Sequence, residues 1–254
     1  MKHLIIFHLF SILASCTAGQ GNEEFNPQLV GSCEGCEAVF EYGDRALGPV
    51  DTLPDFNDIG IRIKVTGRVY EPDGTTPAKD VILYVFHTNQ EGIYESRSGA
   101  RNWERRHGYI RGWLETGEDG RYTFYTMKPG AYPDRSEPAH IHIIVLEPDG
   151  KYYWIEGFLF EDDPMVTPAM RSSLSERGGS DGVVSLQKQG DLFVAERDII
   201  LAGTSRVMNS EFYDYIYLQL IIAIEIFNPL RIKIHVEDCP FPAACHSCDS
   251  LSCV

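Results

Sequence analysis

The chain has 254 residues, 43% of them hydrophobic and 11% aromatic, which is enough apolar material for one substantial domain with extensions. Its formal net charge is -15 at pH 7. Because phosphate binding needs clustered Lys and Arg, this charge excludes nucleic acid as an expected partner and favours a small molecule.

Residues 1–18 are expected to be a signal segment. Lys2 and His3 precede an apolar run at 4–13, which is too short to span a bilayer and is typical of a signal peptide. Cleavage after Ala18 fits the preference for small residues. Alternatively, Leu-Ala-Ser-Cys at 13–16 resembles a bacterial lipobox, which would place a lipid anchor at Cys16. Both alternatives predict a secreted or extracytoplasmic protein without a membrane span.

The remaining cysteines lie near the two ends of the chain: Cys33, Cys36, Cys239, Cys245, Cys248 and Cys253. Export to an oxidising compartment favours disulfides among them. The two Cys-x-x-Cys spacings would also suit a zinc site. Neither alternative indicates a function.

An irregular N-terminal arm is expected at 19–58, where three prolines occur and periodic runs are few. From Ile61 to Thr66, apolar and polar residues alternate as in a half-buried strand. Asp-Gly turns follow at 72–74, 118–120 and 148–150. Short strands between such turns predict an all-β fold, an antiparallel β-sandwich over 59–201.

The sandwich is expected to close with the apolar run at 198–201, after a long loop at 172–190 that is rich in Ser and Gly. Residues 202–254 form a C-terminal extension to which no function is assigned. Its most apolar part, 213–227, contains Asp214 and Glu225, which argue against a membrane span and favour an added strand pair or an interface element.

Two histidines and two tyrosines are the candidate metal ligands. His140 and His142 are separated by one residue of an extended segment, so both imidazoles are expected on one face of the sheet. Imidazole is the commonest metal ligand in proteins. Tyr94 lies in a loop where packing requires no aromatic residue, and Tyr132 lies in the Pro-Gly-Ala-Tyr loop that leads to the histidines.

The order and spacing of these motifs resemble the intradiol ring-cleavage dioxygenases, a family that includes catechol 1,2-dioxygenase and protocatechuate 3,4-dioxygenase. The matching runs are at 65–69, 92–94, 120–124, 128–133, 138–142 and 160–164. The resemblance implies a transthyretin-like sandwich and one non-haem Fe(III), with Tyr94, Tyr132, His140 and His142 as ligands. Phenolate oxygens are hard anionic donors that suit a ferric ion.

The resemblance also implies an enzyme of aromatic catabolism. It would use O2 to cleave a catechol between its two hydroxylated carbons and release a cis,cis-muconate-type diacid. Tyr132 would leave the iron and help to accept a substrate proton. The alternative is a noncatalytic transthyretin-like binding module, which shares the Asp-Gly-x-Tyr-x-Phe and Pro-Gly-x-Tyr patterns and binds no metal.

One position departs from the family pattern. The family usually has an Arg immediately before the Pro-Ala-His-x-His run, where it stabilises negative charge on the substrate, and here this residue is Glu137. Arg111, between aromatic residues, is the predicted substitute, and Arg135 is the second candidate. The loop 95–107 is expected to favour a carboxylated aromatic substrate through Arg97, Arg101, Arg105 and Arg106.

Overall fold

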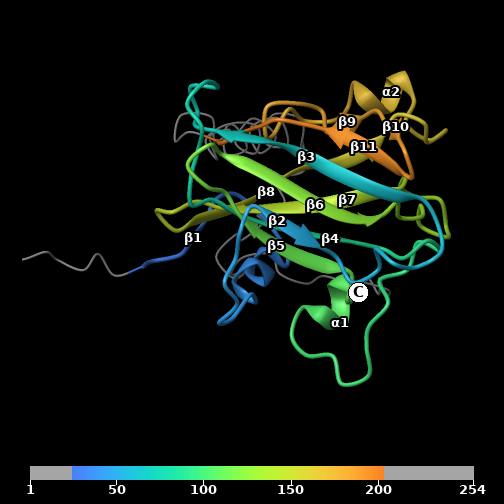
Figure 1. The fold of residues 1–254 in the computed structure, drawn as a ribbon, viewed down its shortest axis with the longest axis horizontal. Coiled ribbons are helices and arrows are strands. Elements are labelled where there is room, and N and C mark those ends of the chain that lie inside the picture. The colour runs from blue at the N-terminus through green and yellow to red at the C-terminus, as the bar shows by residue number, and fades with distance from the viewer. Residues whose placement is uncertain (1–24, 203–254) are drawn as a thin grey trace, which may run out of the picture. The chain divides into compact units, whose positions relative to one another are not determined.

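The computed structural model describes residues 25–202. The predicted signal segment, the alternative anchor at Cys16 and the extension beyond Ala202 lie outside these residues. Two sheets pack together (Figure 1), which confirms the predicted all-β sandwich. Within the described residues, no helix is both long enough and apolar enough to cross a membrane.

The sheet that carries the candidate ligands, called sheet A, has the order β1-β8-β7-β4-β5, with β9 also paired to β8. Its strands are β1 (Gln28–Leu29), β4 (Ile82–His87), β5 (Arg111–Glu115), β7 (His140–Leu146), β8 (Lys151–Phe160) and β9 (Val183–Val184). The central pairs are antiparallel, as predicted, whereas β1 and β9 run parallel to β8.

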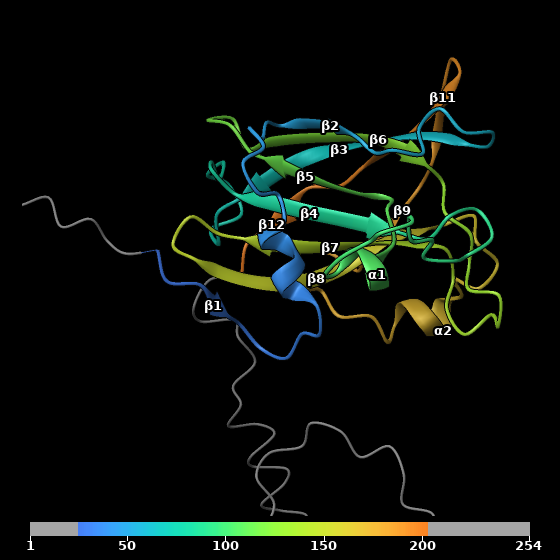
Figure 2. The same cartoon turned by 90° about the horizontal axis from the view of Figure 1, so that it is seen from below.

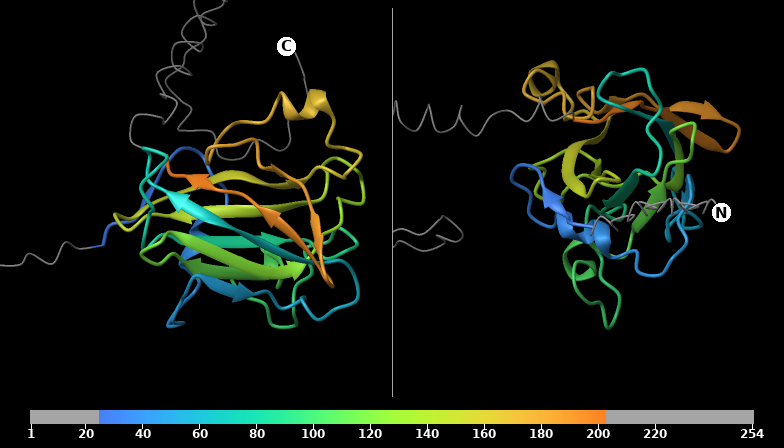
Figure 3. Two further views of the ribbon diagram at one scale, coloured as in Figure 1. Left: turned by 45° about the horizontal axis from the view of Figure 1, so that its top comes forward. Right: turned by 90° about the vertical axis from the view of Figure 1, so that its left-hand side faces the viewer.

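The second sheet, called sheet B, has the order β10-β11-β3-β6-β2, with β12 also paired to β3. Figure 3 shows this order in its left view, from the blue strand β2 through β6 and β3 to the orange strands. The strands are β2 (Val50–Thr52), β3 (Arg62–Tyr70), β6 (Arg121–Met127), β10 (Gln187–Gln189), β11 (Leu192–Glu196) and β12 (Ile199–Ile200). Only β3 with β6 and β10 with β11 are antiparallel pairs.

Two segments are more regular than predicted. The arm 19–58 supplies β1, β2 and the short helix η1 (Cys36–Phe40), and the loop 172–190 supplies β9 and β10. These short strands lack a clear hydrophobic period and are ordered by backbone pairing: β1, β2 and β9 pair with strands more distant in the sequence, and β10 pairs with the adjacent β11.

The main core lies between the two sheets. Ile141, Ile143 and Val145 of β7 are buried there with Val65 and Phe124 of sheet B. Each such side chain contributes about 1.5–3 kcal/mol through its burial. The alternating pattern along each strand therefore assigns one face of sheet A to this core.

A second cluster covers the opposite, outer face of sheet A. Tyr84, Phe86, Trp113 and Ile144 of the sheet pack there with residues of η1. Figure 2 shows η1 as the blue helix in front of the strands of this sheet. The indole nitrogen of Trp113 donates a hydrogen bond to the carbonyl of Val39, at 3.0 Å. The arm is thus a third layer on part of this face.

A disulfide joins Cys33 to Cys36 at the start of η1. This bond agrees with the disulfide alternative for this pair and removes both sulfurs as ligands of the alternative zinc site. The other four predicted partners lie outside the described part of the chain.

Candidate metal centre

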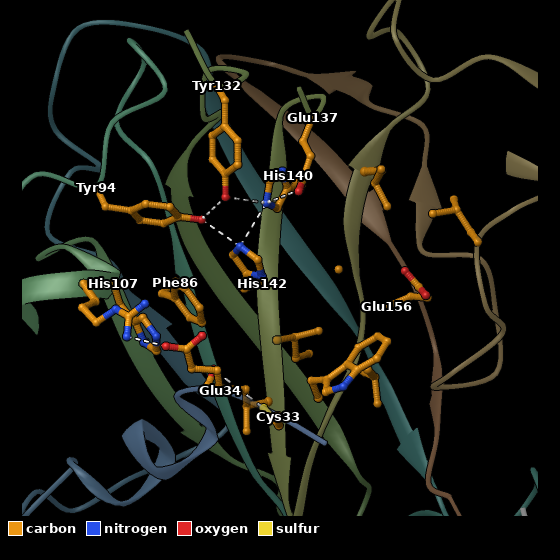
Figure 4. A pocket seen from close by; sticks show the side chains of 18 of the residues that line it. Cys33, Glu34, Phe86, Tyr94, His107, Tyr132, Glu137, His140, His142 and Glu156 are labelled. Atoms are coloured by element: carbon orange, nitrogen blue, oxygen red, sulfur yellow. Dashed lines mark hydrogen bonds and ion pairs between the residues drawn. The ribbon is translucent and has the colours of Figure 1, made fainter. Parts of the chain in front are cut away.

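Four side chains with ligand-type donor atoms meet at one end of the outer face of sheet A (Figure 4). The Tyr94 hydroxyl oxygen lies 2.7 Å from Nε2 of His142 and 3.0 Å from the Tyr132 hydroxyl oxygen. Nε2 of His140 lies 3.0 Å from Nε2 of His142 and 3.4 Å from the Tyr132 hydroxyl oxygen. The structure thus brings together all four ligand candidates found in the sequence, in a closed ring of donor atoms.

Strand β7 supplies both histidines. It begins at His140, and its register with β8 shifts between Ile141 and Ile143, where two steps along β7 match three steps along β8, so the extra residue of the bulge is in β8. Both imidazoles lie on the outer face, while Ile141 and Ile143 between and after them face the main core. Bulges in a strand pair are frequent beside functional sites.

An aromatic stack orients the His142 ring. Phe86 of β4 lies opposite His142 in the strand register. The Phe86 and His142 rings are 4.5 Å apart and nearly parallel, and on its other side Phe86 stacks on His107 with a centroid distance of 3.9 Å. Nδ1 of His107 is in turn 3.0 Å from the Tyr84 hydroxyl oxygen. The stack leaves the His142 imidazole little freedom to turn away from the donor ring.

The backbone fixes the tautomer of His140. Its Nδ1 lies 2.7 Å from the carbonyl oxygen of Pro138, which can only accept a hydrogen bond, so Nδ1 carries the hydrogen. When Nε2 carries no hydrogen, its lone pair faces Nε2 of His142, 3.0 Å away. Burial lowers the pKa of His142 well below its usual value, so the His142 ring is neutral near pH 7. A cation between the two nitrogens would remove the repulsion of facing lone pairs.

Asn89 joins the two loops that carry the tyrosines. Its side-chain Oδ1 accepts a hydrogen bond from the backbone N–H of Ile93, next to Tyr94, at 3.0 Å. Its own carbonyl accepts a hydrogen bond from the N–H of Gly130, also at 3.0 Å, in the loop that leads to Tyr132. One residue thus sets the distance between the two phenols.

Two glycines allow these loops to touch. A Cβ atom at Gly92, where φ is +78°, would clash with the carbonyl oxygen of Ala131. A Cβ atom at Gly130 would clash with the carbonyl oxygen of Gln90. Any larger residue at either position must push the loops apart, and with them the tyrosine hydroxyls.

The tyrosines are protonated unless a cation lies beside them. Burial raises the pKa of both Tyr94 and Tyr132 above the ordinary value near 10. A bound metal ion would supply the free energy needed to ionise them. Such a pair is therefore suited to a site in which the metal and the phenolates stabilise each other.

The donor ring has the dimensions of a metal site. Ligand atoms about 2.0–2.1 Å from one ion lie roughly 3 Å from one another, and the four donors have that spacing. Within residues 25–202, no group of three or more His, Cys, Asp and Glu side chains could hold a metal, so a metal here needs the tyrosines. Two phenolic oxygens and two imidazoles fit the ferric ion expected from the sequence.

A cavity of about 840 Å³ opens beside the donors. All four ligand candidates line it, and its other walls include Phe86, Trp103, His107, Trp154 and Leu159. This volume and aromatic lining suit a small aromatic molecule.

Arg111, the predicted substitute for the family Arg, does not line this cavity. Its guanidinium lies 2.6 Å from a carboxylate oxygen of Glu41 and 3.6 Å from one of Glu104, and its side chain is 13% exposed. Arg135 is exposed in the turn after Tyr132, with φ of 58°, and does not line the cavity either. The structure therefore brings neither arginine to the donor ring.

His107 and Trp154 are cavity residues that the sequence did not single out. His107 is in α1 (Glu104–His107), at the end of the arginine-rich loop, and Trp154 is in the middle of β8. No local pattern marks either residue, since both reach the cavity only through the pairing of distant strands and the packing of the arm.

Comparisons with known proteins match the same part of the chain. A family model described as Dioxygenase matches residues 41–212. Protocatechuate 3,4-dioxygenase beta chain from Burkholderia cepacia is 30% identical over an alignment of 186 positions, which covers 64% of this chain and 76% of that protein. Hydroxyquinol 1,2-dioxygenase from Rhizobium sp. is 30% identical over an alignment of 143 positions, which covers 50% of this chain and 47% of that protein.

Among solved structures, the dioxygenase domain of a dioxygenase and carbohydrate-binding protein fusion from Streptomyces sp. SirexAA-E is similar with a TM-score of 0.47. That comparison has 21% sequence identity and covers 69% of this chain and 98% of the other. The chain spans about half the length of the hydroxyquinol 1,2-dioxygenase that it matches.

Proposed function

The chain belongs to the intradiol ring-cleavage dioxygenase family, and from this premise we propose that it cleaves catechols with O2 at a mononuclear non-haem Fe(III) site. Family membership supports an enzyme that acts on catechol-type rings. The observation that carries the proposal for this chain is the ring of donor atoms from Tyr94, Tyr132, His140 and His142 beside the cavity.

The four donor residues would hold the ion. Bound there, Fe(III) would make a ring carbon of a chelated catechol reactive toward O2, and the product would be a cis,cis-muconate-type diacid. The imidazoles of His140 and His142 would remain neutral ligands, fixed by the Pro138 carbonyl and by the stack on Phe86. Tyr94, which is hydrogen-bonded to His142 and more deeply buried than Tyr132, would stay in place.

Tyr132 would accept a proton from the substrate. Its side chain lines the cavity, as the other three donors do, and burial raises its pKa. A phenolate with a raised pKa is a strong proton acceptor once it is released from a metal. It can therefore take a proton from a catechol hydroxyl that enters the cavity.

Iron content, colour and turnover together test this proposal. The chain expressed in iron-replete medium should contain one iron per protein, absorb visible light through tyrosinate-to-Fe(III) charge transfer, and convert catechol and O2 to a ring-opened diacid. Tyr132→Phe should keep part of the iron, shift the absorption and lower turnover, because it deletes one phenolate while the ring still packs.

The matched control is Tyr125→Phe, the same change on β6 of sheet B outside the cavity lining. It should leave iron content, colour and turnover unchanged. A colourless wild-type protein without iron would contradict the proposal and favour the noncatalytic transthyretin-like module.

We also propose that the mature protein is exported. The support is the signal-like sequence of residues 1–18 and the Cys33–Cys36 disulfide, a bond that persists in oxidising compartments. The intact mass of native protein should correspond to a chain that begins at Gly19 or at an acylated Cys16. An unprocessed N-terminus at Met1 would contradict export.

A further inference from the structure

The arginine-rich loop provides no free cation to the cavity in the described part of the chain. Of its four arginines only Arg106 lines the cavity, and it forms an ion pair with Glu34. Arg97 lies over the ring of Tyr109, 4.6 Å from its centre. The expectation that this loop favours a carboxylated aromatic substrate therefore has no support from the geometry.

The charged groups of the cavity are mostly negative. Glu34, Glu137 and Glu156 line it, and Arg106 is the sole Lys or Arg in the described lining. Among the carboxylates and guanidinium groups of this lining, three negative charges stand against one positive charge. Glu34 is paired with Arg106, and Glu156 accepts hydrogen bonds from the backbone and hydroxyl of Ser175.

Glu137 is the carboxylate next to the donor ring. One of its oxygens lies 3.6 Å from Nε2 of His140 (Figure 4), and within residues 25–202 no Lys or Arg forms an ion pair with it. Its side chain is 57% exposed and can reorient toward a group that enters the cavity. The charge also acts on the donors, since burial chiefly raises the pKa of Tyr94 and Tyr132 and the negative charge of Glu137 adds to this effect.

We infer that Glu137 determines specificity by charge, so that the site accepts catechols with a neutral or cationic ring substituent and disfavours carboxylated catechols. This inference rests on the proposed function. A catechol whose hydroxyls reach the donor ring would hold its substituent in the cavity that Glu137 lines. The Glu137 carboxylate would repel an anionic substituent there and attract an ammonium group. After allowance for solvent screening, each effect should change the relative kcat/KM by about threefold to tenfold.

Three catechols that differ in the charge of one substituent test the inference on the iron-loaded full chain. They are 4-methylcatechol, which is neutral, 3,4-dihydroxybenzoate, which is anionic, and 3,4-dihydroxyphenethylamine, which is cationic. Glu137→Gln should raise kcat/KM for the anion relative to the neutral compound by about threefold to tenfold, and lower that for the cation by a similar factor. A carboxylate substituent also withdraws electrons from the ring, whichever variant is used. The test is therefore the difference in relative kcat/KM between Glu137→Gln and the wild type.

Glu118→Gln is the matched control. It removes the same charge from an exposed carboxylate that pairs with Lys79 and does not line the cavity. This control should leave the three relative rates as in the wild type. In the wild type itself, added salt should reduce the discrimination between anion and cation, since screening weakens the field of a half-exposed charge.

The outcomes separate the inference from the proposed function. If the wild type cleaves all three compounds with ratios that neither salt nor Glu137→Gln changes, the charge inference is overturned and the proposed function stands. If the iron-replete wild type cleaves none of them, both fall. If Glu137→Gln loses iron, the salt dependence of the wild-type ratios decides, and an absence of salt dependence overturns the inference.

Discussion

The two faces of sheet A differ in composition and in what they do. The inner face contributes aliphatic residues such as Ile141 and Val145 to a core that sheet B closes completely. The outer face carries aromatic residues and His142, and it is closed by the arm at one end and left open as a cavity at the other. The same strands thus serve stability on one side and ligand chemistry on the other, so substitutions should separate the two.

The largest effect is expected on the outer face. His140→Ala or His142→Ala should abolish ring cleavage and most of the iron binding, because among residues 25–202 no other imidazole takes part in the donor ring. Iron analysis and oxygen uptake measure these losses. Denaturant unfolding of the iron-free variants should show much smaller changes. Full iron stoichiometry in either variant would contradict the ligand assignment.

The inner face should give the opposite result. Phe124→Ala removes a fully buried ring that packs edge-on against Phe158 with a centroid distance of 5.7 Å. The free energy of unfolding should fall by about 3–5 kcal/mol, as measured in urea. Protein that remains folded should keep its iron and colour. A change in colour without loss of stability would break the proposed division between the faces.

Arg111 belongs to sheet A but does not line the cavity. Its substitution therefore tests whether a residue of this sheet outside the cavity affects stability alone. Arg111→Gln leaves Glu41 and Glu104 without their cation, so we expect a loss of about 3 kcal/mol in the free energy of unfolding. Turnover per bound iron should be unchanged. Adding Glu41→Gln should recover part of the stability. If kcat and kcat/KM instead fall together at full iron content, Arg111 supplies the substrate cation, as the sequence suggests.

The smallest effect concerns His107, beneath the outer-face stack. Burial lowers its pKa from 6.5 to about 4. Between these values the unfolded chain binds more protons than the folded one, so the stability present above pH 6.5 is lost as the pH falls toward 4. Iron-free wild type should lose about 2 kcal/mol more between pH 7.5 and 4.5 than His107→Phe, which keeps a ring in the stack. Equal pH dependence in urea unfolding would contradict this.

Much of the inner face could be predicted from the sequence. The alternation at Ile61 to Thr66 and the Asp-Gly turns identify strands of a sandwich, because side chains in a strand alternate between its faces. The same rule places His140 and His142 on one side of β7. The structure agrees with these expectations, apart from the parallel edge strands.

The outer face could not be predicted in the same way. The sequence favours Arg111 as the substrate cation because it lies between aromatic residues, but its partner Glu41 is in the arm, 70 positions away in the sequence. His107 reaches the stack only because Phe86 lies opposite His142 across two paired strands. Such contacts depend on the relative placement of distant segments, which no local period records.

The pairing of β1 with β8 also has a consequence for how the protein is made. Gln28 lies opposite Lys151, so the arm cannot dock until the ribosome has produced the strand that receives it. Contacts this distant in the sequence carry a large loop-closure entropy and form late. Ser32 to Glu34, which follow β1 and line the cavity, would therefore reach their places after the hairpin of β7 and β8 has formed. A nascent chain would acquire its metal ligands before it acquires the wall that shields them.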